Sequence, residues 1–361
     1  MSGSRRRTQE PASGSVGLRD VAKFAGVSTA TVSRAINTPT LVSEQLRERI
    51  AAAIEKLGWV PDGAAKALAT RRSRAIGAVF PTLSVGDFAR ATNAIQHELQ
   101  QHGYTLLLAC SEYDQRQEFE QVRTFVERGV DGLILVGRAH HADLQSFLDK
   151  QRVPYVFSFV HDGLGGGVCI GPDNRKAMIV LTDYLHELGH RRIAVIAQST
   201  ENNDRAAARL KGIQDALAAH GLAVRPQHMA IGRWTIEEGR ALLRRVLAAN
   251  PRPTAIICGN AHLAVGAQIE CEALGVAVPE EVSIVSYDDI EIMSHLAVPI
   301  TALRVPSEEV GRNAARYVVA EVEGLKVDVT LEHHPELLIR ASSGPPPSKA
   351  ERPPRGRLQH T

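Results

Sequence analysis

Short apolar runs rich in β-branched residues alternate with longer helical patterns through most of this chain. Examples of these runs are AIGAVF at 75–80, DGLILVG at 131–137, RIAVIAQ at 192–198 and VSIVSYDD at 282–289. Strands separated by helix-length segments form βαβ units, whose crossovers produce parallel sheets. The runs are too many for one small sheet, and a Gly-rich segment at 161–167 interrupts the series. We therefore predict an α/β fold with two parallel sheets within residues 75–340.

Length and composition are those of an ordinary folded protein. With 361 residues, 44% of them hydrophobic, the chain can bury a large core in two or three domains. The sequence contains no run of about 18 apolar residues, the length that crosses a membrane. Its start, MSGSRRRTQEPASGSVG, lacks the apolar segment of a secretory signal. We expect a cytoplasmic protein without a membrane partner.

Cysteine and histidine spacing gives no sign of a metal centre. The cysteines are Cys110, Cys169, Cys258 and Cys271, without a CxxC pair. We interpret them as reduced, buried thiols rather than as disulfides or metal ligands. The His140–His141 and His333–His334 pairs lack a helical metal spacing with carboxylates. The sequence therefore predicts no metal and no cofactor.

Charge is distributed unevenly along the chain. Residues 1–74 contain 13 Lys and Arg against 6 Asp and Glu, whereas residues 75–340 contain 25 against 33. A basic head on an acidic body indicates one part that meets a polyanion and one that does not. We expect residues 1–15 to be a disordered basic arm. We also expect the Pro-rich residues 341–361, which lack heptads, to be a disordered tail.

The basic head has the pattern of three short helices within residues 16–60. Leu18, Val21, Ala22 and Ala25 line one face of the first helix, and Gly26 ends it. Ser28 is a good N-cap for a second helix, whose inward residues are Val32, Ala35 and Ile36. A third helix, capped by Ser43, buries Leu46, Ile50, Ala53, Ile54 and Leu57 and stops at Gly58. Two helices joined by so tight a turn predict a helix-turn-helix.

The outer face of the second helix suits the major groove of DNA. It presents Thr29, Ala30, Ser33 and Arg34. Small residues allow close approach, hydroxyls reach phosphates, and Arg34 can donate two hydrogen bonds to guanine. The alternative, a helical appendage that only packs on the larger domain, is disfavoured because the unit is basic and precedes its own linker.

LRDVAKFAGVSTATVSRAIN at 18–37, with the segment that follows it, resembles the lactose-repressor (LacI/GalR) family of bacterial transcription regulators. The resemblance implies that Thr29, Ala30 and Arg34 meet base edges. It also implies that phosphates are held by Ser28, Thr31, Ser33 and Asn37. The sequence departs from the family at Gly17, where many members have a Ser or Thr cap. It departs again at Ala30, which offers a methyl contact but no hydrogen bond.

The linker at residues 61–74, PDGAAKALATRRSR, contains helix-forming alanines but is too short to be a stable helix alone. A solvated tether is the alternative interpretation. The resemblance implies a hinge helix whose Leu68 enters the minor groove and kinks the DNA. Asp62 stands where members commonly have Asn, so its charge lies near phosphates.

For residues 75–340 the resemblance implies a two-lobed fold like that of periplasmic sugar-binding proteins, with a small-molecule effector between the lobes. In open α/β sheets, ligands do bind beyond the carboxyl ends of the strands. The family's effector-contacting positions match Phe88, Asp173, Arg209, Trp234, Asn260 and Asp288. Taken singly, Asp173 or Asn260 would more often be a helix N-cap, Arg209 half of a surface ion pair, and Trp234 or Phe88 part of the core, but together at strand ends they favour a site. Ala261 replaces an Asp that is frequent in the family, which can alter the pocket floor or the ligand.

An aromatic platform with carboxylates, an amide and a guanidinium suits a sugar or sugar acid. The stretch at 86–114, GDFARATNAIQHELQQHGYTLLLACSEYD, is most similar to members that sense gluconate-like sugar acids. We expect a homodimer on palindromic operator DNA, since one short recognition helix reads too few bases.

Two other classes of protein are disfavoured. An enzyme lacks support because the Gly-rich segment fails the dinucleotide spacing and the sequence has no P-loop or nucleophile-elbow motif. We therefore predict no catalytic residues. A periplasmic solute-binding protein would carry a signal peptide where this chain has a helix-turn-helix. The sequence thus predicts a ligand-responsive transcriptional regulator, a repressor by preference.

Overall fold

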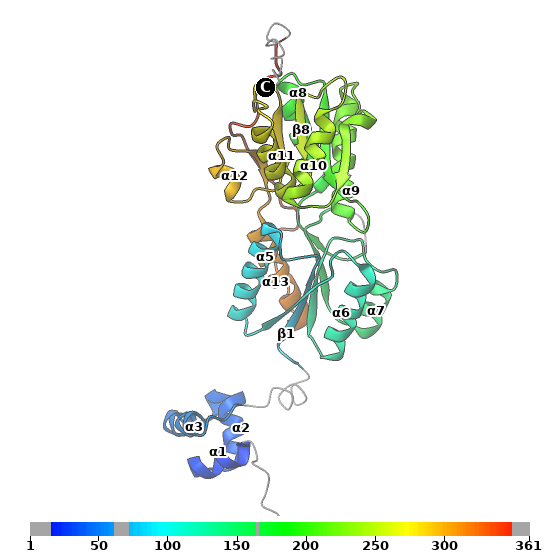
Figure 1. Ribbon diagram of the computed structural model, residues 1–361. Coiled ribbons are helices and arrows are strands. Elements are labelled where there is room, and N and C mark those ends of the chain that lie inside the picture. Colours follow the sequence, from blue (N-terminus) through cyan, green and yellow to red (C-terminus); the bar gives the residue numbers. More distant parts are fainter. Residues whose placement is uncertain (1–15, 61–71, 164–165, 349–361) are drawn as a thin grey trace, which may run out of the picture. The chain divides into compact units, whose positions relative to one another are not determined.

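A computed structural model describes residues 16–60, 72–163 and 166–348. The chain divides into two compact units between Ser73 and Arg74. In the described residues, the first unit is helical and the second consists of two α/β lobes (Figure 1). The predicted hinge features at Asp62 and Leu68 lie outside the described residues.

The first unit has the three predicted helices. They are α1 (Leu18–Ala25), α2 (Thr29–Asn37) and α3 (Glu44–Leu57), with a short 3-10 helix at Pro39–Leu41. Gly26 ends α1 with a φ of 63°, a left-handed conformation that glycine adopts without strain. Apolar side chains from all three helices pack around Val21, Val32 and Ala53, which are fully buried. The predicted inward faces are therefore confirmed.

The helix caps agree only in part with the prediction. Ser28 caps α2, since its Oγ accepts a hydrogen bond of 3.1 Å from Thr31 N. Ser43 precedes α3, but its side chain makes no capping hydrogen bond, so that predicted cap is wrong. Gly17 has no side chain to cap α1. Its N–H instead donates to Asp20 Oδ2 at 2.9 Å, which satisfies one terminal N–H group.

The N-lobe is built on a parallel sheet of order β2-β1-β3-β4-β5. Its strands are β1 (Ala75–Phe80), β2 (Thr105–Cys110), β3 (Gly132–Val136), β4 (Tyr155–Ser158) and β5 (Cys169–Ile170). Its helices are α5 (Gly86–Gln101), α6 (Gln115–Glu127), α7 (Leu144–Gln151) and α13 (Ser307–Glu323). Helices α5 and α13 lie side by side in Figure 1. They approach closely at Gly311, where a Cβ would lie 2.5 Å from Ala91 O.

The C-lobe has a sheet of order β11-β10-β9-β8-β6-β7. Its strands are β6 (Ile193–Gln198), β7 (Met229–Gly232), β8 (Ala255–Cys258), β9 (Ser283–Tyr287), β10 (Thr301–Arg304) and β11 (Glu336–Leu338). Its helices are α8 (Asn174–Glu187), α9 (Asp204–Ala219), α10 (Ile236–Leu247), α11 (Ala261–Ala273) and α12 (Ile292–His295), with a 3-10 helix at Pro226–His228. Strand β11 pairs antiparallel with β10, so this sheet has one antiparallel edge.

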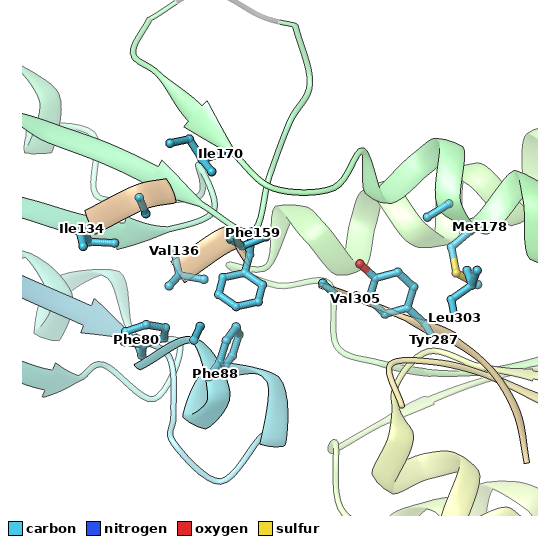
Figure 2. Close-up of a cluster of buried hydrophobic side chains, with 14 of the residues drawn as sticks. Phe80, Phe88, Ile134, Val136, Phe159, Ile170, Met178, Tyr287, Leu303 and Val305 are labelled. Carbon is cyan, nitrogen blue, oxygen red and sulfur yellow. The ribbon is translucent and has the colours of Figure 1, made fainter. Parts of the chain in front are cut away.

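The two lobes are not formed by consecutive halves of the chain. The chain passes from β5 to α8, returns from β10 to α13, and passes again from α13 to β11. One hydrophobic cluster contains residues of both lobes, including Phe88 and Phe159 from one and Tyr287 and Val305 from the other (Figure 2). The two predicted sheets are confirmed, but their division is by crossing segments rather than by a single boundary.

The cysteines and the C-terminal segment can also be compared with their predictions. Cys169, Cys258 and Cys271 are buried, as predicted, whereas Cys110 is only partly buried. The expectation of disorder throughout 341–361 is wrong for its first part, because Ser342 is fully buried and hydrogen-bonded to Ile284 O and Thr301 N. No helix among the described residues is long and apolar enough to cross a membrane.

Candidate functional site

The outer face of α2 is a candidate DNA-reading surface. Thr29, Ala30 and Arg34 are all exposed, while Val32 on the opposite side of the helix is fully buried. Thr29 and Ala30 are small residues at the helix start, and Arg34 follows Ala30 by about one helical turn, on the same face. This is the arrangement that a helix needs to enter a major groove.

The predicted phosphate-holding residues lie on the same helix in two hydrogen-bonded pairs. Ser28 Oγ is 2.8 Å from Thr31 Oγ1, and Asn37 Nδ2 donates to Ser33 Oγ at 3.3 Å. Ser28 and Asn37 are exposed, whereas Thr31 and Ser33 are half-buried. The first pair lies at the start of α2 and the second near its end, so the four side chains are interspersed with Thr29, Ala30 and Arg34 along the helix.

The second candidate site is a narrow cavity of about 40 Å³ between the lobes. Its lining comes from segments that follow the carboxyl ends of strands, as expected for an α/β fold. The lining residues are Val85, Asp87, Phe88, Tyr113, Phe159, Asn174, Gln198, Asn203, Arg205, Arg209, Trp234, Asn260, Tyr287, Asp288 and Val305. A wider hollow of about 600 Å³ shares Tyr113, Gln198, Asn203 and Trp234 with it. Together the two spaces reach the size typical of small-molecule sites, about 300–1,000 Å³.

Five of the six predicted effector residues line this cavity: Phe88, Arg209, Trp234, Asn260 and Asp288. Asp173 does not. Its Oδ1 caps α8 by accepting hydrogen bonds from Arg175 N and Lys176 N, and its Oδ2 lies 3.3 Å from Lys176 Nζ. The cavity is lined instead by the next residue, Asn174.

Asn174 is the centre of a polar network under the cavity. Its Oδ1 accepts hydrogen bonds from Arg209 Nη1 at 2.9 Å and from Tyr287 OH at 3.1 Å. Its Nδ2 donates to Phe159 O at 3.1 Å, which ties α8 to the end of β4 in the other lobe. The guanidinium of Arg209 also lies 4.4 Å from the centre of the Tyr287 ring. These contacts fix three side chains from three elements in one orientation.

Asn260 has two roles. Its Oδ1 caps α11 by accepting from Leu263 N at 2.9 Å, and its Nδ2 lies 3.2 Å from the amide of Gln198. Ala261, which replaces the frequent Asp of the family, is buried in the C-lobe core and does not line the cavity. Ala261 therefore does not form part of the pocket floor, so the replacement of Asp by Ala does not change a direct ligand contact there.

Aromatic rings form the N-lobe wall. The rings of Phe88 and Phe159 meet edge to face with centroids 5.0 Å apart, and Phe88 also contacts Phe80 (Figure 2). Trp234 in the C-lobe packs edge to face on His262. Phe88 is buried and Trp234 half-buried, so Trp234 is the more accessible aromatic surface.

Two acidic residues line the cavity, one from each lobe. Asp87, from the first turn of α5, is 3% exposed, and burial raises its pKa above the ordinary value although Asp288, Arg90 and Ser307 act to lower it. Burial and the neighbouring carboxylate of Asp87 raise the pKa of Asp288 well above its ordinary value, while Arg209 opposes this shift. The next residue, Asp289, points elsewhere and binds Arg304 and Arg340.

Several lining residues adopt left-handed backbone conformations. Tyr113, Phe159 and Asp288 have φ values of 64°, 61° and 70°. Each follows the end of a strand, namely β2, β4 and β9. Such conformations are rare for residues with a side chain and persist where the surroundings hold them, as is common at ligand sites.

Sequence reasoning missed Asp87, Tyr113, Asn174 and Tyr287 among the lining residues. Asp87 and Asn174 stand immediately beside predicted residues, and Tyr113 follows the apolar run of β2. Polar or aromatic residues directly after strands were thus a usable signal. Among the described residues, no group of His, Cys, Asp and Glu is arranged to hold a metal ion.

A helix-turn-helix unit joined to a two-lobed body with a strand-end cavity defines a class of protein, the ligand-responsive DNA-binding regulator. Comparison with known families makes this specific. Residues 73–341 match the periplasmic binding proteins and sugar binding domain of the LacI family, and residues 17–62 match the bacterial regulatory proteins of the lacI family. The chain belongs to the LacI family of bacterial transcriptional regulators.

Individual relatives agree over nearly the whole chain. The HTH-type transcriptional repressor CytR of Escherichia coli K12 is 30% identical, covering 90% of this chain and 96% of the relative. The repressor PurR of Proteus mirabilis is 29% identical with the same coverage. The solved lac repressor dimer bound to operator and the anti-inducer ONPF is 26% identical with a TM-score of 0.80, covering 92% of this chain and all of the other. A CelR–cellobiose complex is 29% identical with a TM-score of 0.67, covering 91% of this chain and all of the other.

Proposed function

We propose that this regulator represses transcription by binding a palindromic operator as a homodimer and is released when a small sugar or sugar acid enters the cavity. The observation that carries the proposal is the narrow, aromatic and polar cavity at strand ends in a chain whose separate helical unit exposes a polar face. The protein would act in the cytoplasm, where the DNA is, and use no catalytic residue.

The DNA contacts proposed for α2 follow from its exposed face. Thr29, Ala30 and Arg34 would read base edges, with Arg34 donating two hydrogen bonds to a guanine. Ser28, Thr31, Ser33 and Asn37 would hold phosphates. Ala30 would contact a thymine methyl group, which is the one base feature an alanine can distinguish.

The effector contacts proposed for the cavity are those of the lining. Phe88 and Trp234 would pack against the ligand, while Arg209, Asn260 and Asp288 would hydrogen-bond to it. Asn174 takes the place expected of Asp173, whose carboxylate is used by the helix cap and Lys176. The name of the CelR relative records cellobiose as its ligand, which supports a carbohydrate here. The resemblance of 86–114 to gluconate sensors supports a sugar acid.

The proposed coupling runs through residues 61–74. Leu68 and its symmetry mate would enter the minor groove from a hinge helix that is marginal alone. A ligand can change operator affinity only through its differential affinity for two arrangements of the lobes. The arrangement that it favours would separate the two hinges and withdraw Leu68 from the groove.

One screen tests the proposal. Operator sites are first selected from random DNA with the full-length protein, and the thermal stability of the protein is then measured with a panel of sugars and sugar acids. We expect a compound that stabilises the protein to weaken operator binding. Failure to select any preferred DNA sequence would overturn the assignment of the recognition helix. A stabilising compound that left operator affinity unchanged would overturn the proposed release.

A further inference from the structure

Asp87 presents its two carboxylate oxygens to different parts of the molecule. Oδ1 accepts a hydrogen bond of 3.1 Å from Ser307 Oγ, at the start of α13, and another from Arg90. Arg90 also donates to Asp289 O at 3.1 Å and to Ser307 Oγ at 3.3 Å. Oδ1 is therefore fully engaged in a network that includes both lobes.

Oδ2 is different. It is buried, belongs to a residue that lines the cavity, and has no hydrogen-bond donor among the described residues. A buried carboxylate oxygen without a donor is strongly unfavourable, because the lost hydration is not replaced. Asp288, which comes from the other lobe, lines the same cavity, and each of the two carboxyls is among the groups that shift the pKa of the other. Two carboxylates can bond to each other only if one of them carries a proton.

We propose that Asp87 is a specificity-determining residue of the cavity and forms a two-carboxyl seat with Asp288. In the free protein the two carboxyls share a proton. In the complex a hydroxyl or ammonium group of the ligand takes the place of that proton. This inference rests on the proposed function, because it takes the cavity to be the effector site. It names what the ligand must supply at this point, which is a hydrogen-bond donor.

The charges around the seat favour such a donor. Arg90 on α5 forms an ion pair with Asp87 and also acts to lower the pKa of Asp288. Arg209 on α9 acts on Asp288 in the same direction, and Tyr113, Tyr287 and Arg205 line the same cavity. A ligand carboxylate placed between Asp87 and Asp288 would be a third carboxyl at one point and would supply no hydrogen-bond donor to replace the shared proton. A sugar acid would thus have to place a hydroxyl in the seat and its carboxylate elsewhere.

The cavity contains a complementary free donor. Arg209 Nε is buried and without a hydrogen-bond acceptor among the described residues, while Nη1 of the same side chain is bound to Asn174. A ligand that offers both donors and acceptors satisfies Asp87 Oδ2 and Arg209 Nε together. Hydroxyl groups do both, which is why the seat fits a polyhydroxylated or amino-substituted molecule.

The first test needs no ligand. Infrared spectra of the full chain at pH 7 are compared among wild type, Asp87→Asn and Asp288→Asn, with the exposed carboxyl variant Glu272→Gln as control. We expect a protonated-carboxyl absorption in wild type and in the control that is lost in both seat variants. Equal spectra for wild type and the seat variants would overturn the shared proton.

The second test uses D-glucose, D-glucosamine and D-gluconate as probes in calorimetric titrations. A probe that binds wild type should release a proton to the buffer, bind more tightly as pH rises, and lose at least about tenfold in affinity with Asp87→Asn. A probe that bound both proteins equally, without proton release, would overturn the seat. If none of the three probes binds, the infrared comparison decides the proposal. Operator selection with wild type tests the proposed function separately, so that failure of one is distinguishable from failure of the other.

Discussion

Arg209 Nη1 donates a hydrogen bond of 2.9 Å to Asn174 Oδ1, and so joins the middle of α9 to the first residue of α8 beneath the cavity. Tyr287 OH donates to the same oxygen at 3.1 Å. One amide oxygen thus orients a guanidinium and a phenol at once. Arg209 is 8% exposed and lines the cavity, and its Nε has no acceptor among the described residues, so this donor is available to a ligand.

We predict that Arg209→Ala abolishes the effector response and leaves operator binding intact. The variant removes the guanidinium that is bound to Asn174, one of two that line the cavity, and the substitution lies in the unit that does not carry α2. Operator titrations with increasing effector would show a repressor that is not released. A normal response in this variant would remove Arg209 from the effector site.

Arg34→Ala should weaken the specific operator complex by about 1–3 kcal/mol and leave non-specific binding nearly unchanged, since a base contact is lost rather than the main phosphate charge. Fluorescence anisotropy with a selected operator and with random DNA measures both affinities. Equal losses on the two DNAs would contradict base readout by Arg34.

Leu68→Ala should weaken the operator complex without changing the effector affinity of the free protein, because the proposed wedge acts only on DNA. Operator anisotropy and effector calorimetry on the same preparation measure both quantities. Wild-type operator affinity in this variant would refute the hinge assignment.

The packing of α8 on α9 gives a stability prediction. A Cβ on Gly212 would collide with Arg175 O, so Gly212→Ala should destabilise the body by about 1–3 kcal/mol, although alanine favours helices. Ala207→Gly, at an exposed position of the same helix, is the control and should cost about 1 kcal/mol from propensity alone. Urea unfolding measures both changes. A stabilised Gly212→Ala variant would show that the two helices separate easily.

Asp289 gives a pH prediction. Burial acts to raise its pKa, but hydrogen bonds from Arg340 and Arg304 prevail and hold the pKa below the ordinary value. The folded state therefore gains stability above the ordinary Asp pKa and loses it as pH falls through the lower folded pKa. Asp289→Asn should cost about 2–3 kcal/mol near neutral pH and remove that part of the acid dependence. Parallel losses of stability in acid for both proteins would contradict this role.

Assembly is tested by light scattering of the full chain at micromolar concentration. We predict a dimer, since a two-fold protein matches a palindromic site and the C-terminal region contains no heptads that would favour a tetramer. A stable monomer or tetramer would contradict the proposed operator geometry.

The helix-turn-helix was predictable because its information is local. The apolar spacing of α1, the glycine at 26 and the serine at 28 each act within a few residues. The long strands were predictable for the same reason. Strands β5, β7 and β11 contain only two to four residues each, too few for a periodic signal, and β11 depends on a partner distant in sequence.

The cavity was predictable only to within a residue. Whether Asp173 or Asn174 faces the ligand depends on the cap of α8, which uses the Asp173 carboxylate and leaves Asn174 at the first helical position. No sequence pattern around Asp87 indicates its proposed role. Its importance comes from Asp288 in the other lobe and from a free oxygen that exists only in the folded molecule.

If ligand in the cavity controls DNA binding, one titration shows it directly. A labelled, selected operator is titrated with wild type and with Arg209→Ala, each with and without the compound that most stabilises the wild-type protein in the thermal screen. We predict that the compound weakens wild-type operator binding by about 5- to 150-fold, the usual range of such coupling, and leaves Arg209→Ala unchanged. An unchanged wild-type affinity, or an equal response of the two proteins, would contradict the claim.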